Sequence, residues 1–128
     1  MIKRTLLIFF LAQITACTSQ VNRHNIVRFE NTCASTLEIH TENRSNFDLA
    51  PYTTLLQPER SAVVATYMAY TETIDKQVQE NYILEITSQH KKTIIGKDKL
   101  LALISEITPQ EKNNSRVWIF TDASLCAP

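Results

Sequence analysis

Three cysteines are the residues of this 128-residue chain whose chemistry is most clearly defined. A cysteine can form a disulfide, bind a metal ion as a thiolate, or carry a covalently attached lipid. Cys33 and Cys126 lie 93 positions apart, whereas Cys17 directly follows an apolar segment near the N-terminus. An odd number of cysteines leaves one without a partner in the same chain, so one of the three needs a separate explanation.

Residues 1–16 have the pattern of a secretory signal peptide. Lys3 and Arg4 give a positive start, residues 5–12 form an apolar core, and small residues follow. A membrane-spanning anchor is the alternative, but the uncharged run of residues 5–17 is only 13 residues long. A helix needs about 20 mostly apolar residues to cross a bilayer. We therefore expect a cleaved signal.

The end of this segment adds a second motif. Ile14-Thr15-Ala16-Cys17 resembles the lipobox of bacterial lipoproteins, with Ile14 and Thr15 as usual variants of that pattern. The resemblance implies that Cys17 receives a diacylglycerol thioether and that the chain is cut before it. The alternative is a secreted protein in which Cys17 is a spare thiol.

The same resemblance predicts a location. Two or more acyl chains anchor a protein stably, so lipid on Cys17 would hold the mature chain on a membrane. In Gram-negative lipoproteins an Asp after the cysteine retains the protein in the inner membrane. Thr18 stands there instead, which implies transport to the outer membrane, with the protein facing the periplasm.

Lipid on Cys17 also accounts for the odd cysteine. Cys33 and Cys126 then remain as an even pair, which we expect to form one disulfide in the oxidising periplasm. A zinc site with nearby histidines is the alternative, and the absence of a C-x-x-C spacing disfavours it. We expect no metal and no other cofactor.

Length and charge limit the remaining chain to one domain with no general basic character. Cleavage would leave 112 residues, which we divide into a lipidated polar tether, 17–25, and a single periplasmic domain, 26–128. Lys3 and Arg4 would leave with the signal, so the 13 basic residues of the chain become 11, against 13 acidic ones. This balance gives no reason to expect a nucleic acid partner.

Apolar residues of the domain alternate with polar ones, as in β-strands with one buried face. Residues 27–30 and 37–40 show this alternation, and the turn-like residues between them predict a hairpin. Residues 61–70 are apolar on both faces, which predicts a central strand; periodicity alone also allows a helix, but the β-branched and aromatic residues favour the strand. The segment 41–54 reads as mostly loop, and 111–116 as a polar loop. Further strands are expected at 82–87, 92–95 and 117–121.

One segment has a helical period instead. Leu100, Leu103, Ile104 and Ile107 lie at i, i+3, i+4 and i+7, which predicts an amphipathic helix over about 98–107 with Asp98 as its cap. The expected fold is therefore mainly β: a compact antiparallel β-sandwich or curved sheet of six to eight strands, with one helix packed against it.

Catalytic motifs are poorly represented. The chain has a single glycine, which rules out a P-loop and a G-x-G-x-x-G motif. Glu38 and His40 share one face of an expected strand and could meet a metal ion, although a solvated face is the simpler interpretation. We do not expect an enzyme.

Aromatic and basic residues are the candidates for an interaction surface, because aromatic rings dominate many interfaces. Tyr70 and Trp118 are the aromatic residues expected to be exposed. His90, Lys91 and Lys92, with Lys97 and Lys99 near the helix start, could form a small basic patch. The simpler alternatives are core aromatics and a hairpin tip kept soluble by charge.

These observations favour a lipid-anchored envelope protein that acts as a non-enzymatic protein-interaction module in the periplasm. An immunity or inhibitor protein that neutralises a toxin or lytic enzyme is the second hypothesis, and an enzyme is the third. The expected partners are the membrane, through lipid on Cys17, and a protein of the cell envelope.

Overall fold

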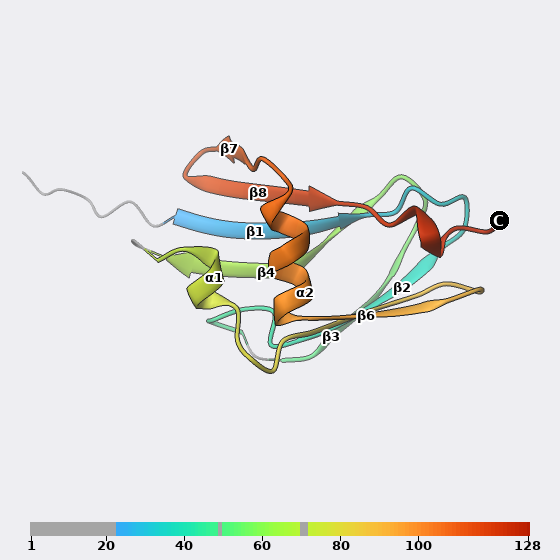
Figure 1. Cartoon of the computed structure of the whole chain (residues 1–128), viewed down its shortest axis with the longest axis horizontal. Coiled ribbons are helices and arrows are strands. Elements are labelled where there is room, and N and C mark those ends of the chain that lie inside the picture. The colour runs from blue at the N-terminus through green and yellow to red at the C-terminus, as the bar shows by residue number, and fades with distance from the viewer. Residues whose placement is uncertain (1–22, 49, 70–71) are drawn as a thin grey trace, which may run out of the picture.

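The computed structural model describes residues 23–48, 50–69 and 72–128 (Figure 1). The lipobox, Cys17, Thr18 and Tyr70 lie outside the described residues. The described chain begins in a strand at Arg23, three residues before the expected domain boundary, so residues 23–25 are not part of a tether. Asn25 is already buried.

Two four-stranded sheets pack face to face, which confirms the expected β-sandwich. The first sheet has the order β4-β1-β8-β7 and the second has the order β3-β2-β5-β6. β1 and β8 are parallel neighbours, and the other pairs are antiparallel. The strands of the first sheet are β1 (Arg23–Glu30), β4 (Ser61–Ala69), β7 (Gln110–Lys112) and β8 (Ser115–Phe120). Those of the second are β2 (Leu37–Glu42), β3 (Tyr52–Leu56), β5 (Ile83–Thr87) and β6 (Lys92–Gly96).

The core lies between the sheets and follows the predicted alternation. Val27 and Phe29 of β1 are buried, whereas their neighbours along the strand are only partly so. Phe29 packs on Phe120 of β8 with ring centroids 5.3 Å apart. The buried apolar residues of both sheets form one cluster, so residues 23–128 share a single core.

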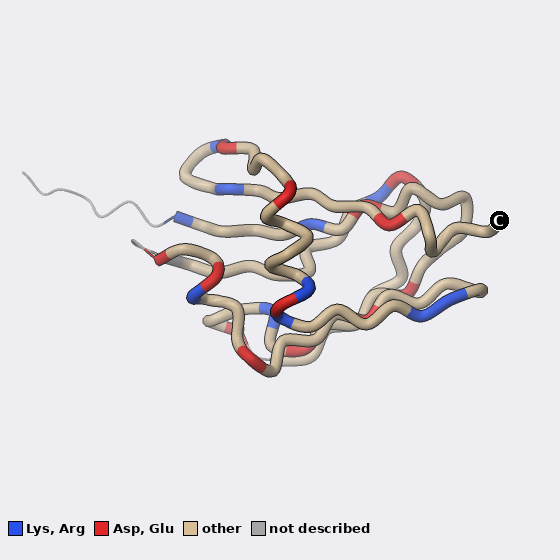
Figure 2. Tube along the Cα trace, in the orientation of Figure 1, with Lys and Arg blue, Asp and Glu red and all other residues tan. Residues whose placement is uncertain are grey.

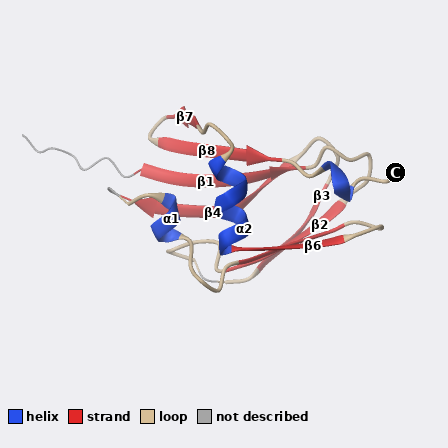
Figure 3. Cartoon of the chain, in the orientation of Figure 1, coloured by secondary structure: helices blue, strands red, loops and turns tan. Residues whose placement is uncertain are grey.

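Helix α2 (Lys97–Ser105) closes one side of the sandwich. It starts directly after β6 and crosses from the second sheet to the first, where it packs beside β8 (Figures 1 and 3). The α2 residues Leu100 and Ile104 are buried, as the helical period predicts. The capping residue is Gly96 rather than Asp98, which lies in the first turn. A carboxylate there still stabilises the positive end of the helix dipole.

Two short helices complete the chain. α1 (Ile74–Gln77), which the sequence analysis did not predict, contains the buried residue Gln77. The Gln77 side chain accepts a hydrogen bond of 2.8 Å from Asn25 Nδ2 of β1 and donates one of 3.3 Å to the Met68 carbonyl of β4. The 3₁₀ helix η1 (Ala123–Leu125) precedes the C-terminus. Ile74 packs against the core and the C-cap residue Val78 is buried, but α1 has only four residues, which is too short to show a helical period.

The predicted hairpin between β1 and β2 is wrong, because the two strands belong to different sheets. Asn31 turns the chain between them. Its backbone N–H donates to the Arg60 carbonyl, its Nδ2 to the Leu56 carbonyl, and its Oδ1 accepts from the Cys33 N–H, each at 2.9 Å. Alternation fixes which face of a strand is buried, but it does not specify the neighbouring strand.

The prediction that residues 61–70 form a central strand is also wrong, because β4 is an edge strand. A β-bulge shifts its register opposite Val27 and Arg28. Val64 and Ala65 are therefore both fully buried although they are consecutive, while Met68 is exposed. The bulge explains why both faces of this strand looked apolar in the sequence.

Two strands lie in segments expected to be loops. β3 overlaps the predicted loop 41–54 at its first three residues, and β7 overlaps the predicted loop 111–116 at its last two. Asn113 and Asn114, with φ values of 48° and 64°, connect β7 to β8. Two consecutive positive-φ residues are typical of a tight type I′ hairpin turn, which asparagine tolerates.

A disulfide joins Cys33 and Cys126, with the sulfurs 2.01 Å and the Cα atoms 5.0 Å apart. Cys33 follows β1 and Cys126 follows β8, so the bridge lies just beyond the ends of two neighbouring parallel strands. This confirms both the predicted pairing and the predicted proximity of the first and last strands.

Candidate functional site

Trp118 is not the exposed aromatic residue that was predicted. It is 7% exposed and points from β8 into the core, beside Val27 of β1. The prediction is wrong because β8 lies between two strands of the first sheet, with its alternate residues turned inward. The other predicted aromatic residue, Tyr70, lies outside the described residues.

The predicted basic residues lie at separate places. His90 and Lys91 are exposed at the tip of the β5–β6 hairpin, where Lys91 Nζ donates to Ser124 Oγ at 2.8 Å. Lys92 pairs with Glu85 at 3.2 Å. Lys97 lies at the other end of β6 and contacts a different carboxylate, so the hairpin tip and the helix start do not form one patch (Figure 2).

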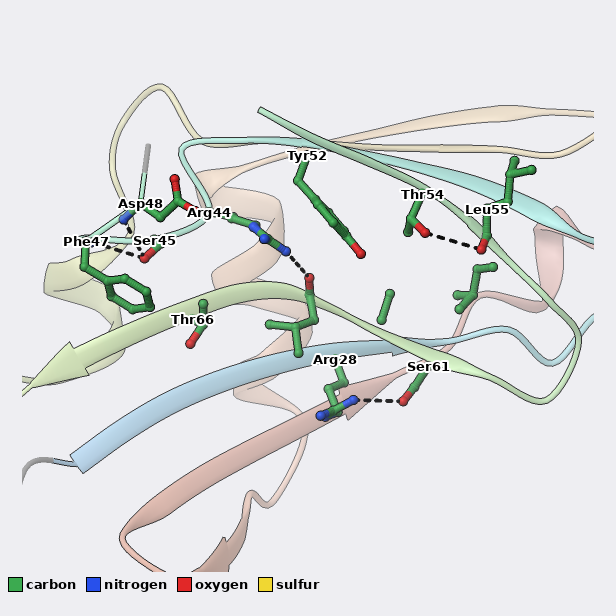
Figure 4. A pocket seen from close by; sticks show the side chains of 13 residues that line it. Arg28, Arg44, Ser45, Phe47, Asp48, Tyr52, Thr54, Leu55, Ser61 and Thr66 are labelled. Atoms are coloured by element: carbon green, nitrogen blue, oxygen red, sulfur yellow. Dashed lines mark hydrogen bonds between the residues drawn. The ribbon is translucent and has the colours of Figure 1, made fainter. Parts of the chain in front are cut away.

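The side of the sandwich opposite α2 is open. A cavity of about 630 Å³ lies there between β3, the edge of the second sheet, and β4, the edge of the first (Figure 4). Residues from β1, from β3, from β4 and from the β2–β3 connection line it. We call this region the open side, and the region covered by α2 the closed side.

Arg44 spans the open side. Its guanidinium lies 3.8 Å from the centre of the Tyr52 ring in β3, and its Nη1 donates to the Val63 carbonyl of β4 at 3.3 Å. A guanidinium stacks well on an aromatic face while its N–H groups remain free to donate in the plane. Arg28 lines the cavity from β1 and donates to Ser61 Oγ at 3.2 Å.

The β2–β3 connection covers the C-terminal part of the β4 edge, from Thr66 to Met68. Thr66 N–H donates to the Arg44 carbonyl at 2.8 Å, next to a β-bridge between Ser45 and Thr66. The Asn46 amide then accepts from Met68 N–H at 3.0 Å and donates to the Met68 carbonyl at 2.7 Å. The Asn46 side chain therefore replaces a neighbouring strand along this part of β4.

The edge of β3 has no such cover among the described residues. Its five residues, Tyr52–Leu56, include no charged side chain. Leu55 is 65% exposed on the strand, and Phe47, at the mouth of the cavity, is 59% exposed. They are the two most exposed large apolar side chains in the described part of the chain. Grouped exposed apolar residues commonly mark an interaction site.

The charge of the cavity is mainly positive. Its lining contains two basic residues, Arg28 and Arg44, and one acidic residue, Asp48, whose Oδ1 already accepts a hydrogen bond of 3.1 Å from the Ala50 N–H. The open side therefore offers cationic donors, hydroxyl groups and apolar surface, which are groups that bind a ligand.

Two buried tyrosines behind this side belong to the core. Tyr82 Oη donates to the Val64 carbonyl at 2.9 Å, and burial together with the nearby Tyr67 raises the pKa of Tyr82 well above its ordinary value. Burial also raises the pKa of Tyr67, whose hydroxyl has no hydrogen-bond partner among the described atoms. Both phenols therefore stay protonated near neutral pH.

Glu38 and His40 lie on the outer face of the second sheet. His40 Nε2 is 3.5 Å from Glu42, and its Nδ1 is 2.7 Å from Thr53 Oγ1, so its ring nitrogens already have neighbours. Within the described ranges, no three His, Cys, Asp or Glu residues come together as they would around a metal ion.

The sequence analysis missed the open side because its residues come from four separate segments. Arg44 and Tyr52 lie in the stretch that was assigned to loop. The β-branched and aromatic residues between Pro51 and Pro58 were the available signal for a short strand. No local pattern indicates that this strand faces the edge of β4.

None of the helices in the described part of the chain is long and apolar enough to cross a membrane. The sequence matches no protein-family model and no curated protein, and the structure matches no solved structure. The functional argument therefore depends on the geometry of the open side and on the N-terminal motif.

Proposed function

We propose that this protein is a lipid-anchored envelope protein that binds another protein through its open side, without catalysing a reaction. The observation that carries the proposal is the β3 edge: a strand without charged residues that carries the exposed Leu55 and borders a cavity lined by Phe47, Arg28 and Arg44. Natural proteins usually cover or charge such an edge unless it is used for binding.

The anchor is the part of the proposal supported by the N-terminal motif. Lipid on Cys17 would leave six residues of chain to Arg23, which span at most about 21 Å when extended. The start of β1 would therefore stay near the membrane. Thr18 supports the outer membrane, and the signal peptide supports a periplasmic orientation.

This anchoring would orient the domain. The start of β1 and the β5–β6 hairpin lie at opposite ends of the long axis (Figure 1). The basic hairpin tip would therefore point away from the membrane, which favours a periplasmic contact over lipid headgroups for His90 and Lys91. The open side runs along the flank of the sandwich, where a neighbouring protein can approach it.

Substitution of Cys17 tests the anchor. We expect Cys17→Ser to remain uncleaved or become soluble, so that it no longer fractionates with membranes. Thr18→Asp serves as the matched variant, and it should move the processed protein from the outer to the inner membrane fraction. A Cys17→Ser protein that is still processed and membrane-bound would contradict the proposal.

Substitution on the open side tests binding. Native electrophoresis of detergent-extracted membranes should show the protein in an assembly larger than the chain alone. Leu55→Glu should release it from this assembly, whereas Ile94→Glu, at a residue 55% exposed on the opposite edge strand β6, should not. If the protein that co-purifies is a toxin or lytic enzyme, the inhibitor hypothesis replaces the envelope assembly.

A further inference from the structure

We infer that the partner binds by adding an extended segment as a fifth strand along β3, with an acidic side chain of that segment directed into the cavity. This inference rests on the proposed function and specifies the chemistry of the partner. Strand addition supplies backbone hydrogen bonds to the exposed edge, and alternate side chains provide specificity.

The four sheet edges differ in how they are protected. β6 has α2 packed against it, and β7 has only three residues, all exposed. β4 has a bulge, and Ser45 and Asn46 cover the C-terminal part of its edge. Bulges, short strands, charges and covering segments are the usual means of preventing strand addition. β3 has none of these protections in the part of the chain that the structure describes.

The alternation of β3 determines where the side chains of an added strand would lie. Tyr52, Thr54 and Leu56 are the less exposed residues of β3 and line the cavity, whereas Thr53 and Leu55 are exposed, although Leu55 also belongs to the cavity lining. Side chains of a strand point alternately to the two faces of its sheet. Every second side chain of an added strand would therefore enter the cavity, and the others would lie beside Leu55.

The charge of the cavity selects an acidic side chain. Among the described residues, the Arg44 guanidinium donates one hydrogen bond, to the Val63 carbonyl, and a guanidinium has five N–H donors. Its stacking on Tyr52 fixes the plane of these donors. A carboxylate can accept two parallel hydrogen bonds from such a group. Arg28 adds a second positive charge to the same cavity.

The outer face selects a different residue type. Leu55 is paired with Glu38 of β2, so the row beside an added strand contains one exposed apolar and one acidic side chain. An apolar residue of the partner would cover Leu55. The expected segment therefore alternates acidic and apolar residues over four or five positions, since the five residues of β3 span about 17 Å.

Site-specific photo-cross-linking of the full-length protein in its native cells tests this geometry. A photoreactive benzoylphenylalanine would replace Leu55 in one strain and Ile94 in the control strain. We expect a discrete protein adduct from position 55 and none from position 94. Mass spectrometry of the adduct should place the cross-link in an extended segment with Asp or Glu at an adjacent position.

Charge reversal tests the acidic contact. Arg44→Glu should lower the adduct yield at position 55 at least tenfold, because charge-assisted hydrogen bonds contribute about 1.5–3 kcal/mol. Arg60→Glu changes charge equally at an exposed residue of the β3–β4 turn that does not line the cavity, and it should leave the yield unchanged. Because Arg44 also braces two strands, Arg28→Glu provides a second variant that leaves this brace in place.

Several results would overturn the inference. These are no adduct at position 55, equal adducts at positions 55 and 94, a cross-linked segment that is helical or lacks an acidic residue, and yields unaffected by both Arg44→Glu and Arg28→Glu. The membrane fractionation of Cys17→Ser and the assembly seen by native electrophoresis do not depend on this contact. If those tests give the expected results while cross-linking does not, the proposed function is still supported and the strand-addition geometry is rejected.

Discussion

The closed and open sides of the sandwich solve the same physical problem differently. On the closed side, α2 fills the gap between the sheets with Leu100 and Ile104, which are 0% and 4% exposed. On the open side, a guanidinium stacked on Tyr52 connects the two edges, and a cavity remains beside it. The apolar packing of α2 stabilises the fold but covers the space between the two sheets on that side. The polar brace contributes less stability and leaves strand edge and charge available to a partner.

Removal of the disulfide should lower the free energy of unfolding more than any other change considered. Its effect is the reference for the smaller effects expected on the closed and open sides. The bridge closes a loop of 93 residues at an end of the sandwich, so its loss restores much conformational entropy to the unfolded chain. We expect the free energy of unfolding to fall by about 4 kcal/mol for Cys33→Ala with Cys126→Ala, measured by urea titration against the oxidised protein. An unchanged unfolding midpoint would mean that the contacts on the closed and open sides hold the two sheets together without the disulfide.

Leu100→Ala should produce the largest effect that is specific to the closed side. The side chain is fully buried between α2 and the sheets, and its truncation leaves a cavity. We expect the free energy of unfolding to decrease by about 3 kcal/mol, with membrane fractionation and cross-linking at position 55 unchanged. Loss of partner binding at a temperature where the variant is folded would show that the two sides are coupled.

Alkaline unfolding tests whether the interior behind the open side is dry. Burial raises the pKa of Tyr67 and of Tyr82 above the ordinary value of 10.0. Above that pH the unfolded chain loses both protons while the folded protein keeps them, so stability falls as pH rises. The expected slope is up to about 1.4 kcal/mol per pH unit for each tyrosine.

Tyr67→Phe provides the control for this slope. It removes a hydroxyl without a hydrogen-bond partner among the described atoms, so near pH 7 the variant should be at least as stable as the original protein. Above pH 10 it should retain about half of the slope. A slope unchanged by the substitution would mean that water reaches Tyr67 through the cavity.

Arg44→Ala should have a modest effect on stability and a large one on binding. It removes the stacking on Tyr52 and the hydrogen bond to Val63, which together stabilise a partly exposed site by about 1 kcal/mol. Arg44→Lys keeps the charge but loses the planar donors, so we expect it to bind the partner more weakly than the original protein. If Arg44→Ala lowered the free energy of unfolding by several kcal/mol, the role of Arg44 would be mainly structural, like that of Leu100.

Leu55→Ala completes a matched pair with Leu100→Ala and has the smallest expected effect. Leu55 is 65% exposed, so its truncation should change the free energy of unfolding by less than about 0.5 kcal/mol. The same substitution should still reduce the assembly seen by native electrophoresis. A stable variant that retains the whole assembly would remove Leu55 from the interaction surface.

The same contrast separates what could be predicted from what could not. The strand β1, the helix α2 and the disulfide follow from signals within the chain: alternation at Val27 and Phe29, a helical period at Leu100 and Ile104, and the parity of the cysteines. Alternation and helical period reflect which residues of a segment are buried, so they can be recognised in the sequence of that segment alone.

The open side depends on which segments become neighbours. Arg28, Arg44 and Tyr52 line one cavity because β3 and β4 are the edges on the same side of two different sheets. The wrong hairpin between β1 and β2 has the same cause, since Asn31 redirects the chain through contacts with distant residues. No pattern within a single strand encodes such contacts.

The disulfide also makes most of the domain a closed covalent ring. Seven of the eight described strands, β2 to β8, lie between Cys33 and Cys126, and β1 is the one that lies outside. A protease that cuts one loop inside this ring opens it without releasing a fragment. Both pieces stay joined to the N-terminal segment, and through it to any anchor there, until a second cut or a reductant separates them. A single cut inside the ring would therefore leave all seven of these strands covalently attached to the N-terminal segment.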